Sequence, residues 1–279
     1  MAFRIARAIN QESSRFDVVH YHGHCPLVPL FVRERNKLVL TFHDFSGLCP
    51  GRLNFRDTDR CVDLDRRRCG GCLYGTGAIR NRVTAFNVRL LRHFVAQALS
   101  GLRVMFVSTA LREVYRTNLP GSDQGRWRTV HNFSGMARMW PGSTRLDLVA
   151  RHGLAAARAI GLVLADFSAA KGVLSLLELL HPLLASWNLG LVVAGDGPQM
   201  GRIRQRFTGD RVALPGWLTE QDAISHLRSA DFAVLPTLCD EACSTVMLQA
   251  LWARLPVFAL DRGGNRELAA HGPELCHLE

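Results

Sequence analysis

Residues 230–257 carry the clearest pattern in the sequence, reading Ala230-Asp-Phe-Ala-Val-Leu-Pro-Thr-Leu-Cys-Asp-Glu-Ala-Cys-Ser-Thr-Val-Met-Leu-Gln-Ala-Leu-Trp-Ala-Arg-Leu-Pro-Val257. An apolar run over 231–235 leads into a polar loop that holds Glu241. A helical pattern over 244–254 follows, and a second apolar run begins at Pro256. Strand, loop, helix and strand in this order are typical of a parallel sheet. We therefore predict an α/β unit with Glu241 in a loop at a strand end.

The same alternation of short apolar runs and helical patterns extends over the rest of the chain. Further strands are expected at 17–21, 38–42, 103–107, 128–131, 161–165, 189–194, 211–214 and 256–260. Helices are expected at 5–10, 79–99, 109–118, 173–187, 200–207 and 219–228. Runs that are apolar throughout suit parallel strands covered on both faces. The pattern predicts a doubly wound α/β fold.

Two segments interrupt this alternation. Residues 47–77 are rich in Gly, Arg, Asp and Cys and lack periodicity, as expected for an inserted loop. Residues 134–153 contain glycine and proline without a strand signal, which makes them the best linker candidate. We therefore expect one domain over 1–153, which includes the insert and the linker, and a second over 154–279.

Composition narrows the classes of protein. The chain has 279 residues, of which 48% are hydrophobic and 21% charged, and this excludes a disordered tail or a collagen-like fibre. The formal net charge is +10, but nearly all cations are Arg, because lysine occurs only at Lys37 and Lys171. Dispersed arginines and poor aromatic interleaving make a nucleic-acid-binding module the least favoured class.

No apolar stretch has the length that spans a bilayer, and the first residues lack a signal-peptide core. We therefore expect a cytoplasmic protein that can rest at the inner membrane through its arginine-rich surface. Cysteines in that compartment are mostly reduced, which favours thiol or metal roles over disulfides.

Three further motifs lie in the second half of the chain. Residues 191–198 form an apolar run that enters the turn Gly195-Asp196-Gly197, the kind of strand end where α/β folds bind ligands. Lys171 stands just before a helical pattern, where a cation can help to hold a phosphate. Gly263 and Gly264 allow backbone amides to approach an anionic ligand.

Together these blocks, from about residue 161 to 268, resemble the nucleotide-sugar-binding domain of retaining GT-B glycosyltransferases of the group-1 type, also called family 4. The resemblance implies two Rossmann-like domains and transfer of a sugar from a UDP- or GDP-sugar to a glycan or lipid-linked acceptor. It implies that Lys171 binds donor phosphate and stabilises the leaving group, that Glu241 contacts the donor sugar and that Gln249 holds the ribose. No metal cofactor is implied for catalysis.

The first half resembles the acceptor-side domain of the same family. The run Phe16-Asp-Val-Val-His-Tyr-His22 and the run Leu38-Val-Leu-Thr-Phe-His-Asp44 both end in histidine. The resemblance implies that His43, beside Asp44, contacts the reacting centre. Alternating His20, His22 and His24 could also be a metal site, but no acidic partner is spaced for one.

Two positions depart from the family pattern. Ala165 and Asp166 stand where Gly-Arg is usual, and Gln249 stands where an acidic residue is usual. Asp166 places a negative charge where a diphosphate would lie, a repulsion of roughly 1 kcal/mol or more at surface-like dielectric. The family's opening strand with its glycine-rich loop and its last strand are also not expected in this chain. An inactive relative that acts as a binding partner is therefore the alternative to an active enzyme.

Four cysteines lie in the insert: Cys49, Cys61, Cys69 and Cys72. Four thiolates, two of them in a Cys-x-x-Cys pair, can hold a structural zinc ion. The outer spacings are irregular, so unligated thiols are an equal alternative.

Overall fold

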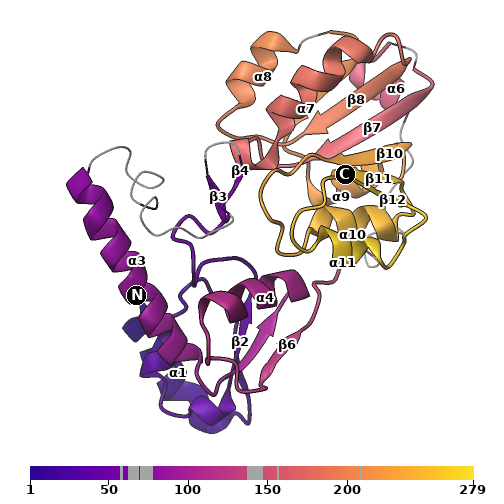
Figure 1. The fold of residues 1–279 in the computed structure, drawn as a ribbon. Helices are drawn as coiled ribbons and strands as arrows, with labels where there is room; N and C mark the ends of the chain where they lie inside the picture. The colour runs from indigo at the N-terminus through magenta and orange to yellow at the C-terminus, as the bar shows by residue number, and fades with distance from the viewer. Residues whose placement is uncertain (57–58, 62–68, 70–77, 137–146, 156, 208) are drawn as a thin grey trace. The chain divides into compact units, whose positions relative to one another are not determined.

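The computed structural model describes residues 1–56, 59–61, 69, 78–136, 147–155, 157–207 and 209–279 (Figure 1). The chain forms two compact units, Met1–Asn132 and Phe133–Glu279. Each unit has a parallel β-sheet of its own, as the apolar runs predicted.

The first unit contains a four-stranded parallel sheet in the order β1-β2-β5-β6. Its strands are β1 (Val19–Tyr21), β2 (Leu38–Phe42), β5 (Arg103–Phe106) and β6 (Trp127–Thr129). Its helices are α1 (Ala2–Glu12), α3 (Ala78–Leu99) and α4 (Thr109–Asn118), with short 3-10 turns at Ser13–Arg15, Val28–Phe31 and Arg35–Lys37. Two short strands of the insert, β3 (Phe55–Arg56) and β4 (Asp59–Arg60), pair antiparallel.

Strand β2 lies at the centre of the first unit's core. All five of its residues are buried, as its continuous apolar run predicted. Phe42 packs against Phe106 of β5 and against Tyr115 of α4. The hydroxyl of Tyr115 accepts a hydrogen bond from Gly47 N at 2.8 Å and donates one to Asp44 O at 3.2 Å. The loop that follows β2 is therefore fastened to α4.

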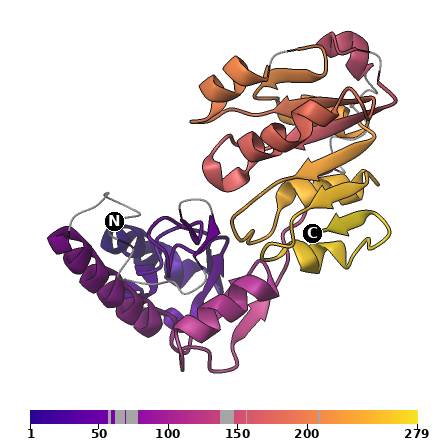
Figure 2. The same cartoon turned by 45° about the horizontal axis from the view of Figure 1, so that its top comes forward.

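The second unit contains a six-stranded parallel sheet in the order β12-β11-β10-β7-β8-β9 (Figures 1 and 2). Its strands are β7 (Ala159–Leu164), β8 (Leu189–Ala194), β9 (Val212–Gly216), β10 (Phe232–Leu235), β11 (Val257–Ala259) and β12 (Cys276–Leu278). Its helices are α6 (Leu148–His152), α7 (Val173–Leu180), α8 (Met200–Arg206), α9 (Glu220–Leu227), α10 (Thr245–Trp252) and α11 (Asn265–Ala269). The order reverses between β7 and β10, which is the doubly wound arrangement.

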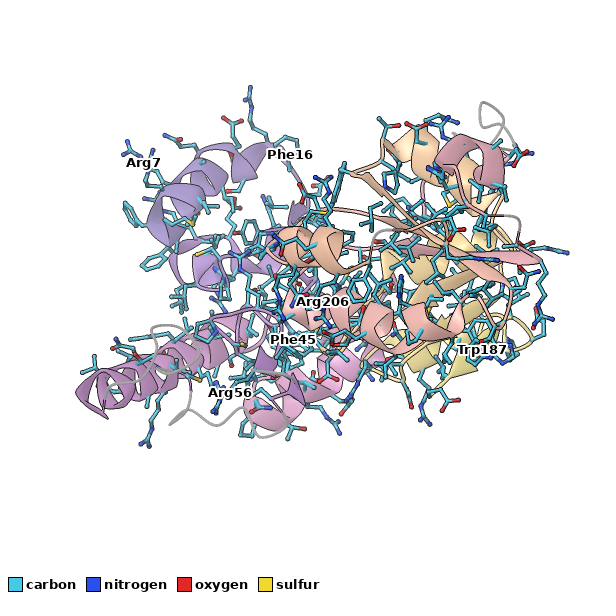
Figure 3. The ribbon with its side chains drawn as sticks, turned by 90° about the horizontal axis from the view of Figure 1, so that it is seen from above. Arg7, Phe16, Phe45, Arg56, Trp187 and Arg206 are labelled. Atoms are coloured by element: carbon cyan, nitrogen blue, oxygen red, sulfur yellow. The ribbon has the colours of Figure 1, made fainter. Side chains whose placement is uncertain are left out.

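A continuous core cluster joins β7 and β8 to the helices that follow them. It includes Val163, Leu177, Val193 and Ile203. On the surface, Arg206 of α8, labelled in Figure 3, pairs with Glu178 of α7. Helices α7 and α8 are thus held together on one face of the sheet.

All nine predicted strands are present within a few residues of their expected bounds. The helix expected over 173–187 is shorter, because α7 ends at Leu180 and a 3-10 turn containing Pro182 follows. Proline has no amide hydrogen and cannot continue an α-helix ladder. Strand β12 was not among the predicted strands. Its three residues are too few to give a periodic signal.

The boundary between the units falls earlier than the expected 153/154. Helix α6 lies in the expected linker, with Asp147 as its N-cap and left-handed Gly153 at its end. His152 of α6 hydrogen bonds to His226 of α9, Nε2 to Nε2, at 2.9 Å. These contacts place the described end of that segment in the second unit.

Candidate donor-binding site

The second unit has a pocket of about 450 Å³ at the carboxyl ends of its central strands. Neighbouring strands β7 and β10 are followed by chain segments that leave in opposite directions, which opens a crevice for ligands. The lining residues come from the segments after β7, β8, β9 and β10 and from the start of α10. They are Leu164, Ala165, Asp166, Lys171, Ala194, Gly195, Trp217, Leu218, Glu220, Ala223, Leu235, Pro236, Thr237, Glu241, Cys243, Ser244, Thr245, Val246 and Gln249.

An ion pair joins the two charged residues that the sequence singled out. Lys171 Nζ donates a hydrogen bond to Glu241 Oε1 at 2.5 Å. The side chains are 24% and 14% exposed, so water screens the pair only partly. Burial works against the charge of Lys171, but Glu241 outweighs it, and the pKa of Lys171 is raised above its ordinary value. Lys171 is therefore a firmly charged cation inside the pocket.

Backbone contacts join the turn that carries Lys171 to the loop that carries Glu241. Leu238 N and Cys239 N both donate to Ala170 O, at 2.8 and 3.2 Å. Gly172 has φ of 67°, and a Cβ there would lie 2.1 Å from Pro236 O. The turn that carries Lys171 thus packs directly on the loop that carries Glu241.

The paired glycines hold the other side of the Glu241 loop. Gly264 N donates to Glu241 O at 2.7 Å. Gly263 has φ of 58°, and a Cβ there would lie 2.3 Å from the same oxygen. A side chain at Gly263 is excluded both by the left-handed backbone and by this close approach.

The predicted donor-binding residues divide into two groups. Gly195 and Gln249 line the pocket together with Lys171 and Glu241. Asp196, Gly197, Gly263 and Gly264 do not line it. Asp196 shapes the turn after β8, since its carbonyl accepts from Phe167 N at 2.8 Å and its Oδ1 accepts from Gly197 N at 2.7 Å.

The charges around the pocket are mostly negative. Asp166, Glu220 and Glu241 line it, and Lys171 is the one Lys or Arg among the described lining residues. Asp166 Oδ1 accepts a hydrogen bond from Ser168 N at 3.1 Å, and its charge contributes to the raised pKa of Lys171. The carboxylate of Asp166 is thus turned toward its own loop, but its field still reaches the lysine.

Sequence reasoning missed several lining residues. Trp217 is the most prominent, since its side chain is 76% exposed at the pocket. It follows Gly216, the last residue of β9. A large aromatic residue directly after a strand-ending glycine was the signal that could have found it. Cys243 also lines the pocket.

The predicted residues of the first unit also gather at strand ends. His20 lies in β1, His22 follows β1, and His43 follows β2. His22 Nδ1 lies 3.0 Å from His43 Nε2, and His22 Nε2 lies 3.2 Å from His20 Nδ1. His24 contacts Asp44 instead, at 3.1 Å.

The expected zinc site stays a prediction. Cys49, Cys61 and Cys69 are partly buried, and Cys72 lies outside the described residues. Within the part of the chain that the structure describes, no group of three or more His, Cys, Asp or Glu side chains is arranged to hold a metal ion. Likewise, none of the described helices has the length and apolarity needed to cross a membrane.

Comparison with known proteins identifies the fold. Residues 158–278 match the family model described as "Glycosyl transferases group 1". No curated protein matches the sequence. Among solved structures, the Anabaena protein Alr3699/HepE in complex with UDP-glucose is 16% identical with a TM-score of 0.62, over 94% of this chain and 65% of that one.

Two further structures agree. Sucrose-phosphate synthase from Thermosynechococcus elongatus is 17% identical with a TM-score of 0.66, over 99% of this chain and 64% of its own. WaaG, a glycosyltransferase involved in lipopolysaccharide biosynthesis, is 15% identical with a TM-score of 0.62, over 98% of this chain and 67% of its own. This chain therefore has the α/β fold of GT-B glycosyltransferases, and it spans slightly less than two thirds of the Anabaena protein.

Proposed function

We propose that the protein is a retaining glycosyltransferase that moves a sugar from a nucleoside-diphosphate donor to a hydroxyl group. The observation that carries the proposal is the Lys171–Glu241 pair, which lies in a pocket at the switch point of a doubly wound sheet. The family match over 158–278 covers this pocket. The structures solved with UDP-glucose, UDP and ADP belong to proteins of the same fold, which supports a nucleotide donor.

Four pocket residues have a role in this proposal. Lys171 binds the diphosphate and stabilises the negative charge that develops as it leaves. Glu241 accepts hydrogen bonds from hydroxyls of the donor sugar, and Gln249 hydrogen bonds to the ribose. Gly195 leaves room for the donor to approach the backbone. Because Lys171 supplies the positive charge, the proposed reaction needs no catalytic metal.

Retention follows from a front-face mechanism. In this proposal no protein side chain acts as the nucleophile, and the departing phosphate accepts the proton of the acceptor hydroxyl. His43 of the first unit would contact the reacting centre. The acceptor in this proposal is a glycan or a lipid-linked glycan, as in polysaccharide biosynthesis, and its recognition belongs to the first unit.

Helix α3 supports a peripheral contact with the membrane. Four large apolar side chains at helical spacing are exposed along it: Val83, Phe86, Leu90 and Phe94, at 55%, 64%, 41% and 39%. An exposed apolar stripe on a chain with net charge +10 suits the surface of an anionic bilayer. We propose that a protein in the cytoplasm would meet its lipid-linked acceptor there.

The alternative function is that of an inactive relative that acts as a binding partner. Asp166 and Glu220 favour it, because two carboxylates besides Glu241 line a pocket that would hold a diphosphate. At a few ångströms each uncompensated charge opposes the phosphate by roughly 1 kcal/mol at surface-like dielectric.

Calorimetric binding of UDP and GDP tests the proposal, with Lys171→Ala as the test variant. Lys37→Ala is the matched control, since Lys37 is the only other lysine and lies in the first unit, near Ser13 and Glu34. We expect binding that Lys171→Ala abolishes and Lys37→Ala preserves, together with sugar transfer. Binding without transfer, or no binding of either nucleotide, would overturn the glycosyltransferase proposal and favour the inactive relative.

A further inference from the structure

Two side chains of the donor-binding pocket have no role in the proposed reaction and no partner of their own. Trp217 lines the pocket and is 76% exposed, and its indole makes no ring contact among the described residues. Glu220 also lines the pocket, and its carboxylate makes no hydrogen bond or ion pair with any residue that the structure describes. A large flat ring and a carboxylate with free acceptor oxygens are therefore both available to a ligand.

The local structure holds both side chains at the carboxyl end of β9. Trp217 directly follows Gly216, the last residue of β9, and Glu220 is the first residue of α9. Thr219 caps this helix, since its Oγ1 accepts from Asp222 N at 3.1 Å and donates to Asp222 Oδ2 at 2.8 Å. The carboxylate of Asp222 is thereby engaged in the cap, whereas the carboxylate of Glu220 is not.

One side of α9 borders the pocket. Glu220 and Ala223 both line it, and residues three apart lie on the same side of a helix. Gln221 and Asp222, which lie between them, are not among the described lining residues. This wall of the pocket therefore consists of one carboxylate, one small side chain and the exposed indole of Trp217.

The strand order places this wall at one end of the pocket. Along the sheet the order is β10, β7, β8 and β9. The proposed function puts the donor sugar at Glu241, after β10, and the diphosphate at Lys171, after β7. Neighbouring strands lie about 4.8 Å apart, so β9 is roughly 10 Å from β7, on the side away from β10. Because the diphosphate of a sugar nucleotide lies between the sugar and the nucleoside, the base lies on the β9 side.

We propose that Trp217 and Glu220 form a nucleobase site that selects guanine. This inference rests on the proposed function and narrows its donor to a GDP-sugar. The indole of Trp217 stacks on the base, and such stacking tolerates any base, because every base has a π-face. The selection between bases therefore belongs to Glu220.

The hydrogen-bonding edge of each base makes a carboxylate selective. Guanine presents a ring N–H and an exocyclic amine side by side, and the two oxygens of one carboxylate can accept both hydrogen bonds. Uracil presents a single ring N–H between two carbonyl oxygens, which a carboxylate repels. Adenine presents an amine beside a ring nitrogen that only accepts. Glu220 therefore favours guanine, and its exposure to water keeps the preference moderate, because water screens its charge.

Titration calorimetry of the full chain with three free nucleotides tests the selection. We expect GDP to bind about tenfold more tightly than UDP. Inosine diphosphate should lie between them, because its base retains the ring N–H of guanine but lacks the amine. Glu220→Gln should equalise GDP and UDP, since an amide pairs equally well with a ring N–H beside a carbonyl, which both bases present. Glu274→Gln changes an exposed Glu of the same unit outside the described pocket lining and should retain the preference.

Variants of Trp217 test the stacking separately. Trp217→Ala should weaken GDP and UDP by similar factors of about tenfold, and Trp217→Phe should restore most of the loss, because it keeps a ring. Bound GDP should also quench tryptophan fluorescence more in the wild-type protein than in Trp217→Phe.

The outcomes separate this inference from the proposed function. UDP binding as tight as GDP binding, or a preference for GDP that survives Glu220→Gln, would overturn guanine selection and leave the glycosyltransferase proposal standing. Loss of affinity for UDP but not for GDP in Trp217→Ala would overturn the stacking role. Absence of binding by both nucleotides would overturn the inference together with the function on which it rests.

Discussion

The Lys171–Glu241 pair sets an obstacle for any diphosphate that enters the pocket. Lys171 Nζ already donates a hydrogen bond to the carboxylate of Glu241 at 2.5 Å. A phosphate that binds Lys171 therefore has to replace this carboxylate as the acceptor. A hydrogen bond to a charged group stabilises a protein by about 1.5–3 kcal/mol, so breaking the Lys171–Glu241 bond opposes phosphate binding. Glu241 therefore has two opposing effects, since it orients the sugar and competes with the phosphate.

Replacement of this carboxylate should separate the two effects. We expect Glu241→Gln to tighten the binding of UDP about three- to tenfold, because Lys171 is released, while sugar transfer falls sharply. Asp240→Asn is the control, because it also removes one negative charge but from a neighbouring residue that does not line the pocket. Titration calorimetry measures the affinities, and weaker UDP binding by Glu241→Gln would contradict the competition.

At the residue scale, sequence alone predicts the parts of the site but not their contacts. Lys171, Glu241 and Gln249 were each identified, and all three line one pocket. The ion pair was not predicted, because it joins residues 70 positions apart and depends on how two loops pack. Trp217 was missed because an exposed aromatic residue in a turn has no periodic pattern to mark it.

Strands and helices with long apolar runs could be predicted from the sequence. Short elements that depend on a capping residue or on pairing at the edge of a sheet could not. Strand β2 is buried along its whole length and was located correctly. Strand β12 adds at the sheet edge through only three residues, Cys276–Leu278, whose burial alternates. Helix α6 is five residues long and depends on its Asp147 cap and on Gly153. Such short elements exist through tertiary contacts rather than through intrinsic propensity.

A pair of glycine variants tests how the loops of the second unit are held. Gly153 and Gly263 have nearly equal φ values, 61° and 58°, but only Gly263 has a neighbouring backbone in the way. Gly153→Ala should cost about 1–2 kcal/mol in the free energy of unfolding, from the left-handed backbone alone. Gly263→Ala should cost about 1–3 kcal/mol more, because its Cβ meets Glu241 O. Urea unfolding measures both, and equal losses would contradict the close approach.

Helix α3 allows the proposed membrane contact to be tested. We expect Phe86→Ser combined with Phe94→Ser to reduce sedimentation with anionic vesicles severalfold, since each exposed ring loses apolar area in the interface. Leu179→Ser, on α7, removes another exposed apolar side chain, which is 71% exposed, and should leave binding unchanged. Equal loss in both proteins, or vesicle binding unaffected by the α3 changes, would refute a role for α3.

In the second unit as a whole, one buried histidine and one half-buried histidine make stability depend on pH. His226 is fully buried, donates from Nδ1 to Asp222 O and meets His152 at Nε2. Burial is the main cause that lowers the pKa of both histidines, and Arg151 adds to it. Below their ordinary value of about 6.5, the unfolded chain then binds protons that the folded chain does not.

The sign of the effect follows directly. The contribution of these two histidines to the free energy of unfolding is fully present above about pH 7. It falls as the pH drops through about 6.5 toward the lower pKa values of the folded state. We expect the urea midpoint to be lower at pH 5.5 than at pH 7.5, and we expect His226→Gln to reduce this difference between the two midpoints. His271→Gln is the control, because it changes an exposed histidine of the same unit and should leave the difference unchanged. A pH dependence unaltered by His226→Gln would contradict this account.

The reversal of strand order also has a consequence for how the second unit assembles. Strands β7, β8 and β9 follow one another in the chain, and so do β10, β11 and β12, so each trio can form from local crossovers. The two trios meet along β7 and β10, whose register pairs only Phe232 with Gly161 and Ala233 with Leu162. Lys171 belongs to the first trio, and Glu241 and Gln249 belong to the second. A nucleotide held by all three residues would stabilise the pairing of β7 with β10, so that amide exchange along β10 would report whether the nucleotide is bound.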